Sequence, residues 1–177
     1  MNTVGNQAIF DHTLTAFFCS VRCPGNLIIK TYDLAQQWRV REQPVIGGFH
    51  SPVEKEVLKI LFRSMTPVCI VLARSVPKRF PPEYRRPLNE GRLLIVSPFE
   101  SQVKRATADT AVRRNEVVAQ LAERIFVAYA ATGSKTESFC REIVSTTKPC
   151  HTFDDPRTAN LITMGFSPWF SEGGDVH

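Results

Sequence analysis

Two loops of this sequence combine small residues with a single cation and stand directly before a segment of helical periodicity. One runs from Ser20 to Gly25 around Arg22, and the other runs from Gly133 to Glu137 around Lys135. The first N–H groups of a helix carry about half a positive charge and bind anions. Hydroxyl, ammonium and guanidinium groups beside them add hydrogen bonds that a phosphate accepts. We expect phosphate contacts at Ser20, Arg22, Gly25, Gly133, Ser134, Lys135 and Thr136.

A third loop, Gly47-Gly48-Phe49-His50-Ser51, also precedes a predicted helix. Its two glycines let the backbone approach a ligand closely, because they carry no Cβ atom. His50 and Ser51 stand at the mouth of the helix. His50 fits three roles: a hydrogen-bond donor to phosphate, a base, or a plain turn residue. The predicted ligand residues of this loop are Gly47, Gly48, His50 and Ser51.

Arg114 and Asn115 lie near the start of another predicted helix. A guanidinium beside an amide in the first helical turn can bind a phosphate together with a base or ribose edge. The alternative is a helical turn that faces solvent.

Glu137 is the one candidate for a catalytic carboxylate. It stands three residues after Ser134, as Glu54 stands three residues after Ser51. This spacing is typical of a capping box, in which the carboxylate bonds back to the start of the helix. Capping and acid/base catalysis therefore both remain open for Glu137.

Other constellations are incomplete. Cys19, Cys23 and His50 lack a fourth metal ligand at a usual spacing. The Gly-x-Gly-x-x-Gly signature, the Walker loop and the Gly-x-Ser-x-Gly elbow are all absent. We expect no cofactor and no metal. The five cysteines form no CxxC pair, which indicates free thiols in a reducing compartment.

The positive charge of the chain is concentrated in one window. Lys and Arg number 22 against 17 Asp and Glu, a net charge of +5. The window 74–114 holds ten basic and four acidic residues, so it accounts for all of the excess. A local positive field suits a polyanionic partner, and a solvated basic face is the alternative.

Composition predicts one globular domain. Hydrophobic residues make up 43% and charged residues 22% of the 177, which excludes extended disorder. No apolar run could span a bilayer and no secretory signal precedes the domain, so we expect a cytoplasmic protein without a membrane partner. We expect flexible ends at about 1–12 and 170–177.

Strands and helices are predicted to alternate along the chain. Apolar runs predict strands at 14–19, 45–46, 67–73, 93–96, 125–130 and 149–153. Helical periodicity predicts helices beginning near Pro24, Ser51, Thr110 and Ser134. This alternation indicates an α/β fold: a single Rossmann-like domain with a mainly parallel sheet and helices on both faces. Such sheets bind ligands beyond the carboxyl ends of their strands, where the candidate loops lie.

The order of these loops resembles that of the DprA/Smf DNA-processing proteins, over roughly residues 14 to 155. Their Rossmann-like domain belongs to a wider group, called SLOG, that includes the LOG phosphoribohydrolases. Ser20-Val21-Arg22 resembles the family's Gly-Ser-Arg turn, and 47–51 lies where the family has Ser-Gly-x-Ala-x-Gly. Arg114-Asn115 resembles its Arg-Asn-Arg, and 133–136 resembles its Ser-Gly-Ser-x-x-Thr loop.

The sequence also departs from these relatives. Glu116 stands where DprA proteins have a second Arg, and Lys135 adds a charge to a loop that is usually neutral. The LOG signature Pro-Gly-Gly-x-Gly-Thr-x-x-Glu is absent, since Glu137 directly follows Thr136. This difference argues against a close LOG enzyme.

The resemblance implies a protein that binds a nucleotide or single-stranded nucleic acid through phosphates, without covalent catalysis, and that forms a homodimer. Two alternatives remain open. One is a hydrolase of the nucleotide N-glycosidic bond that uses Glu137. The other is a sensor domain for a small nucleotide.

Overall fold

The computed structural model describes residues 1–170 and contains one eight-stranded sheet. The strands lie in the order β1-β5-β4-β3-β2-β6-β7-β8. All neighbouring pairs are parallel except β1 with β5. The strands are β1 (Asn2–Gly5), β2 (Thr15–Cys19), β3 (Val45–Gly47), β4 (Val68–Val71), β5 (Leu93–Ser97), β6 (Arg124–Tyr129), β7 (Cys150–Thr152) and β8 (Ser167–Pro168).

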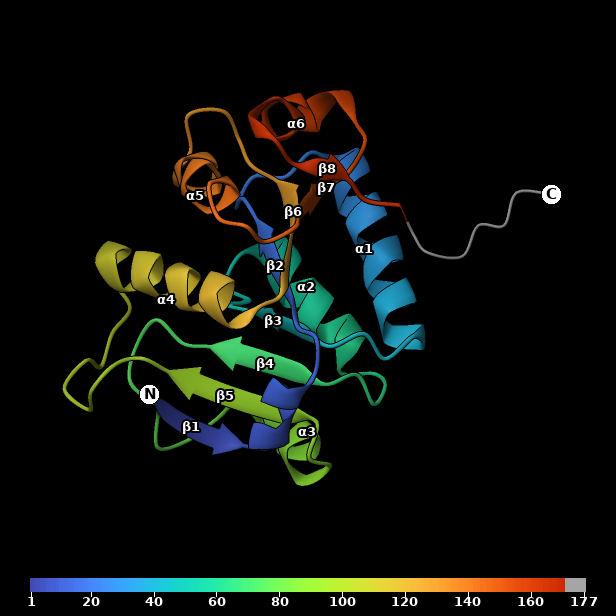
Figure 1. The fold of residues 1–177 in the computed structure, drawn as a ribbon. Coiled ribbons are helices and arrows are strands. Elements are labelled where there is room, and N and C mark those ends of the chain that lie inside the picture. The colour runs from blue at the N-terminus through green and yellow to red at the C-terminus, as the bar shows by residue number, and fades with distance from the viewer. Residues whose placement is uncertain (171–177) are drawn as a thin grey trace.

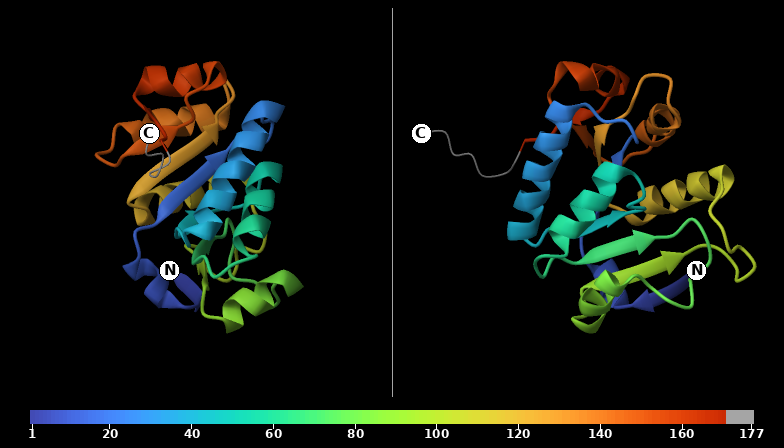
Figure 2. Two further views of the ribbon diagram at one scale, coloured as in Figure 1. Left: turned by 90° about the vertical axis from the view of Figure 1, so that its right-hand side faces the viewer. Right: turned by 180° about the vertical axis from the view of Figure 1, so that it is seen from behind.

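Helices cover both faces of this sheet (Figure 1). Helices α1 (Gly25–Val40) and α2 (Pro52–Leu61) pack side by side on one face, and α3 (Arg85–Asn89) joins them near the start of β5. Helices α4 (Ala108–Leu121), α5 (Lys135–Val144) and α6 (Ala159–Met164) cover the other face. The views in Figure 2 show the two layers from the side and from behind. The predicted Rossmann-like α/β fold is confirmed.

Each face of the sheet has its own hydrophobic core. Side chains alternate across the sheet along each strand, so Phe17 and Phe18 of β2 point into different cores. Phe17 stacks on Phe126 with ring centroids 6.3 Å apart and meets the edge of Trp38 at 5.8 Å. Phe18 packs on the other face against Phe139 of α5, at 5.1 Å. Burying one such side chain contributes about 1.5–3 kcal/mol, so these contacts fix the helices on the sheet.

The point where the strand order reverses lies between β2 and β6. The chain runs from β2 to β3, β4 and β5 on one side and then returns to place β6 on the other side of β2. In open α/β sheets a crevice forms at this reversal, beyond the carboxyl ends of the strands. Ser20 closes the base of the crevice, because its Oγ accepts a hydrogen bond of 3.1 Å from the Ala131 N–H.

The N-terminal residues, which we expected to be flexible, form regular structure. Residues Asn2–Gly5 form β1, which pairs antiparallel with β5, and Ile9 is only 1% exposed in the core. The predicted flexible C-terminus falls almost entirely on 171–177, which lie outside the described residues. The connection between β4 and β5 forms a 3₁₀ turn, Pro82–Tyr84, that leads into α3.

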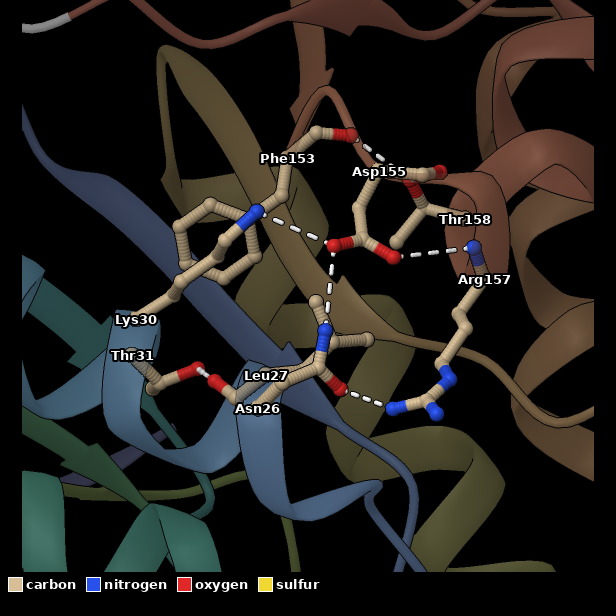
Figure 3. A network of polar contacts seen from close by, with 8 residues as sticks. All are labelled: Asn26, Leu27, Lys30, Thr31, Phe153, Asp155, Arg157 and Thr158. Carbon is tan, nitrogen blue, oxygen red and sulfur yellow. Dashed lines mark hydrogen bonds and ion pairs between the residues drawn. The ribbon is translucent and has the colours of Figure 1, made fainter.

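A network around Asp155 fixes the start of α1 to the segment that follows β7 (Figure 3). The Asp155 carboxylate accepts hydrogen bonds from Asn26 Nδ2 at 3.1 Å, Lys30 Nζ at 3.0 Å and the Arg157 N–H at 3.0 Å. The Arg157 guanidinium also donates to Asn26 Oδ1. This part of the strand-end edge is therefore closed by the protein's own polar contacts.

No helix among residues 1–170 is both long and apolar enough to cross a membrane.

Candidate functional site

The turn after β3 is strained in a way that brings Gly48 against Arg114. Phe49 adopts a positive φ of 48°, which is uncommon for a residue with a bulky side chain, and its ring is buried. A Cβ atom on Gly48 would lie 2.5 Å from Arg114 Nε and 2.7 Å from its Cδ. Only glycine leaves room for this side chain, so the glycine predicted for ligand approach makes space for the protein's own guanidinium.

Arg114 is buried without a carboxylate partner. It projects from α4 and is 4% exposed. Its Nε and Nη2 donate to Asn115 Oδ1 at 3.1 and 2.9 Å, and no other hydrogen bond or ion pair joins its guanidinium to residues 1–170. Burial lowers the pKa of Arg114, although the nearby Glu54 charge opposes this shift. A buried charge without a direct partner costs several kcal/mol, which an anion bound beside it would offset.

Glu54 joins the start of α2 to the turn after β3 and to the end of β2. Its carboxylate accepts from the N–H groups of Ser51 at 2.9 Å, His50 at 3.0 Å and Cys19 at 3.1 Å, and from His50 Nδ1 at 3.0 Å. Burial acts to raise the pKa of Glu54, but the hydrogen bonds from His50, Ser51 and Cys19 outweigh it and lower the pKa. The predicted capping box at Ser51 is confirmed. The bond to Cys19 additionally ties α2 to the end of β2.

A pocket of about 470 Å³ lies beyond the strand ends, between the N-terminal halves of α4 and α5. We call it the edge pocket. Its polar wall contains five of the predicted residues, and its apolar wall includes Val21, Val112 and Phe139. The five are His50, Arg114, Asn115, Lys135 and Thr136.

The start of α5 supplies further donors to the edge pocket. Ser134 caps the helix by accepting from the Glu137 N–H at 3.1 Å. The N–H groups of Lys135 and Thr136 belong to the first turn, which has no carbonyl partner within the helix. Lys135 is exposed, and its ammonium group has no ion pair within residues 1–170. The edge pocket is therefore lined by Arg114 and by the first two residues of α5, Lys135 and Thr136.

The remaining predicted residues lie outside the edge pocket. Ser51 and Ser134 act as helix caps, Ser20 bonds to Ala131, and Gly133 forms a turn at a φ of 75°. Gly47 lies under the Phe49 ring, and Gly25 begins α1, where a Cβ atom would have nothing within 4 Å. Arg22 lines a neighbouring hollow.

Glu137 makes contacts that suit a structural residue. Its Oε1 accepts from Arg141 at 3.0 Å and from the Gly133 N–H at 3.4 Å, and its Oε2 accepts from Asn160 at 2.6 Å. The hydrogen bonds from Asn160 and Arg141 lower its pKa. The predicted second capping box is thus only half formed, because the carboxylate bonds to Gly133 and α6 rather than to the Ser134 N–H.

Two further expectations need correction. Helix α4 begins at Ala108, so Arg114 and Asn115 lie beyond its first turn and its terminal amides do not join them. The window 74–114, which we expected to form a local positive field, is also not gathered at the edge pocket. Arg92 is buried, Arg86 pairs with Glu90, and Arg113 pairs with Glu116. Of the basic residues in the window, only Arg114 lines the edge pocket.

Sequence reasoning missed the other lining residues of the pocket, and three of them affect how a ligand would bind. Val21 forms an exposed apolar edge, and Asp109 and Glu142 add negative charge to the rim. An anion must therefore lie toward Arg114 and Lys135. The sequence alone could place Asp109 on the same helix as Arg114. It could not show that Glu142 of α5 lines the same pocket. No group of three potential metal-ligating side chains occurs within residues 1–170.

Comparison of the structure with solved proteins identifies its fold. A structure of DNA processing protein A from Helicobacter pylori superposes with a TM-score of 0.78 and 17% identity, covering 95% of this chain and 80% of that one. DNA processing protein A from Streptococcus pneumoniae superposes with a TM-score of 0.77 and 14% identity, covering 94% of this chain and 62% of that one. The fold is DprA-like.

A more distant similarity in fold reaches a different class of protein. A molybdenum cofactor binding protein from Rippkaea orientalis gives a TM-score of 0.59 with 10% identity, covering 88% of this chain and 86% of that one. No protein-family model and no curated protein matches the sequence. The chain spans 62% of the Streptococcus pneumoniae protein, so the DprA-like fold accounts for only part of that longer relative.

Proposed function

We propose that this protein binds single-stranded DNA through its phosphates at the edge pocket. The observation that carries the proposal is Arg114, a guanidinium that is 4% exposed, lacks a carboxylate partner within residues 1–170, and lines a pocket shared with Lys135. A phosphate beside Arg114 would receive charge-assisted hydrogen bonds and offset the cost of burying the charge.

Each donor of the pocket has a distinct role in this proposal. Arg114 and Lys135 hold the phosphate, and the first amides of α5 complete its coordination. Asn115 orients the guanidinium through Oδ1 and has its own amide N–H groups left for a neighbouring base or sugar. Val21, Val112 and Phe139 offer apolar surface against which a base can pack.

The DprA-like fold supports DNA rather than another phosphate ligand. The Helicobacter pylori structure concerns the single-stranded DNA binding mode of that protein, and it superposes on 95% of this chain. The cations of the pocket and the lack of a nucleotide-binding glycine signature in the sequence are consistent with recognition of a backbone rather than of one base.

The geometry does not favour cleavage of an N-glycosidic bond. Both oxygens of Glu137 are hydrogen-bonded to the protein, and Glu137 does not line the edge pocket. A small-nucleotide sensor would use the same phosphate donors as a DNA-binding protein. The number of nucleotides bound distinguishes these two.

A thermal-shift panel tests the proposal. Mononucleotides, dinucleotides, inorganic phosphate and single-stranded DNA are added separately to the full chain, since a ligand that binds the folded state raises its melting temperature. We expect the largest shift with single-stranded DNA. A larger shift with a mononucleotide at equal phosphate concentration would favour the sensor.

We also propose that the protein acts in the cytoplasm and forms a homodimer. All five cysteines are free and four are buried, which suits a reducing compartment. Sedimentation of the full chain at several concentrations tests the homodimer.

A further inference from the structure

The edge pocket continues into a second hollow on the outer side of α2. This hollow, of about 660 Å³, lies between α1 and α2 and includes Arg22, Tyr32, Lys55 and Lys59. We call it the α1–α2 hollow. Val21 lines both cavities and is 63% exposed between them. A ligand that leaves the edge pocket past Val21 therefore enters a basic hollow directly.

A third hollow lies on the opposite side of the same helix. This α2–α3 hollow, of about 410 Å³, is also lined by Lys55 and Lys59. Lys55 and Lys59 line both the α1–α2 hollow and the α2–α3 hollow, so they form a crest between the two. Figure 2 shows α2 between α1 and α3. Lys55 has no ion pair within residues 1–170, and Lys59 pairs only with the partly buried Glu56.

The far wall of the α2–α3 hollow contains a second buried guanidinium with an unmet donor. Arg92 is 5% exposed; its Nε donates to Glu90 at 2.6 Å and its Nη2 to the Phe62 carbonyl at 2.9 Å. Its Nη1 is buried without a hydrogen-bond partner among the described residues. Leaving such a donor unpaired costs about 1–3 kcal/mol, which an acceptor that reached it from the hollow would offset.

Aromatic rings accompany the cations along this route. Tyr32 lines the α1–α2 hollow, and Phe62 and Tyr84 line the α2–α3 hollow. Tyr84 meets the Phe62 ring at 5.7 Å and the Phe80 ring at 6.5 Å, which holds it in place. Alternating cations and aromatic rings are the features by which proteins hold single strands without reading their sequence.

The path from the edge pocket toward the start of α1 and Asp155 is closed. At the start of α1 the Asp155 carboxylate already binds Lys30, Asn26 and Arg157, and Asp154 beside it adds another negative charge (Figure 3). A phosphate would be repelled there and would find Lys30 already paired. A strand leaving the edge pocket is thereby directed toward α2.

We propose that the ligand is a single strand of several nucleotides that runs from the edge pocket past Val21, through the α1–α2 hollow and over Lys55 and Lys59 to the α2–α3 hollow. This proposal rests on the proposed function and adds its ligand length and path. A mononucleotide would fill the edge pocket alone. A strand gains phosphate contacts on the crest and stacking contacts on Tyr32 and Tyr84.

The test compares two lengths of oligothymidylate on two matched variants of the full chain. Lys55→Ala/Lys59→Ala removes the crest. Arg41→Ala/Arg63→Ala is the control. Arg41 follows the end of α1 and Arg63 follows the end of α2, and neither lines the edge pocket or either hollow. Both variants remove two positive charges. Fluorescence anisotropy measures the affinity for a trinucleotide and for a strand of about 15 nucleotides, the upper range of compact single-strand sites.

In the wild type and in the control variant, we expect the longer strand to bind at least tenfold more tightly than the trinucleotide. In the crest variant this ratio should fall toward one, and the logarithmic salt slope for the longer strand should become shallower by about 0.7 for each phosphate that the crest no longer binds. A crest variant that matches the control would overturn the path. Equal affinity for both lengths in the wild type would also overturn it, while leaving phosphate binding at the edge pocket intact. Absence of binding at either length would instead contradict the proposed function.

Discussion

The Arg114 guanidinium lies so close to Gly48 that a Cβ atom there would be 2.5 Å from Nε. These residues come from α4 and from the turn after β3, and their contact places a charge at the reversal point of the sheet. The strained Phe49 and the Glu54 hydrogen bonds hold that turn in place. Stability and the proposed phosphate binding would therefore be coupled at one contact.

Gly48→Ala should destabilise the protein and displace Arg114. We expect a loss of about 1–3 kcal/mol in the free energy of unfolding, because the new methyl group overlaps buried atoms. DNA binding should weaken in parallel. Gly25→Ala is the matched control, since a Cβ there has nothing within 4 Å. Denaturant unfolding checks both variants, and equal stability of the two would show that the contact is relaxed in solution.

Arg114→Met should separate binding from stability. Methionine fills similar space without burying a charge, so the free energy of unfolding should stay the same or rise by about 1–3 kcal/mol. Affinity for single-stranded DNA should fall at least tenfold, about 1.4 kcal/mol. Arg113→Met removes the neighbouring arginine, which is paired with Glu116 and half exposed, and should change neither quantity greatly. Normal DNA binding by Arg114→Met would rule Arg114 out as a phosphate ligand.

Glu54→Gln should lower stability at neutral pH and alter its dependence on acid. The pKa of Glu54 in the folded protein is below its ordinary value of 4.5, so its charge stabilises the fold above that pH. This contribution disappears as the pH falls through the lowered pKa. We expect a deficit of about 1–3 kcal/mol near pH 7 that shrinks below about pH 4.5. Unfolding curves of the wild type, Glu54→Gln and the control Glu56→Gln at several pH values measure this deficit. A deficit that does not change with pH would refute the stabilising role of the Glu54 charge.

Glu137→Gln should behave as a structural variant. Its contacts with Arg141 and Asn160 join α5 to α6, and weakening them should lower the melting temperature. Incubation of the wild type with nucleoside monophosphates should release no free base by chromatography. Base release that disappears in Glu137→Gln would restore the hydrolase alternative.

Glu142→Gln should tighten DNA binding. Glu142 is exposed on the rim of the edge pocket and repels a phosphate there. Removing its charge should raise the affinity several-fold at low salt and less at high salt, because salt screens exposed charges. The same substitution at Glu100, which is exposed and lies outside the edge pocket, serves as the comparison. An equal gain in both variants would indicate an effect of net charge alone.

The sequence predicted the buried strands and the Ser51 cap well because those signals are local. Apolar runs such as 67–73 and the Ser51 to Glu54 spacing carry their own physical meaning. The edge strand β1 was missed because a short polar segment is a strand only through its pairing with β5. Likewise, no local pattern distinguishes the buried Arg92 from the exposed Arg85 in the basic window.

The candidate site was predicted in its parts but not in its arrangement. His50, Arg114 and Lys135 were all identified, yet only the fold shows that they share a pocket while Arg22 lies in the next one. The contact between Gly48 and Arg114 depends on how α4 packs across the sheet. Periodicity predicts that a helix packs there, but not which side chain meets the turn.

The most direct test of phosphate binding at the edge pocket is the affinity for single-stranded DNA as a function of salt, in the wild type and in Lys135→Ala. Lys135 makes no ion pair within residues 1–170, so its loss should not perturb the fold. We predict that the logarithm of the wild-type association constant falls linearly with the logarithm of salt concentration, and that the variant shows a slope smaller by about 0.7. Identical slopes in the two proteins, or no binding at low salt, would contradict the account.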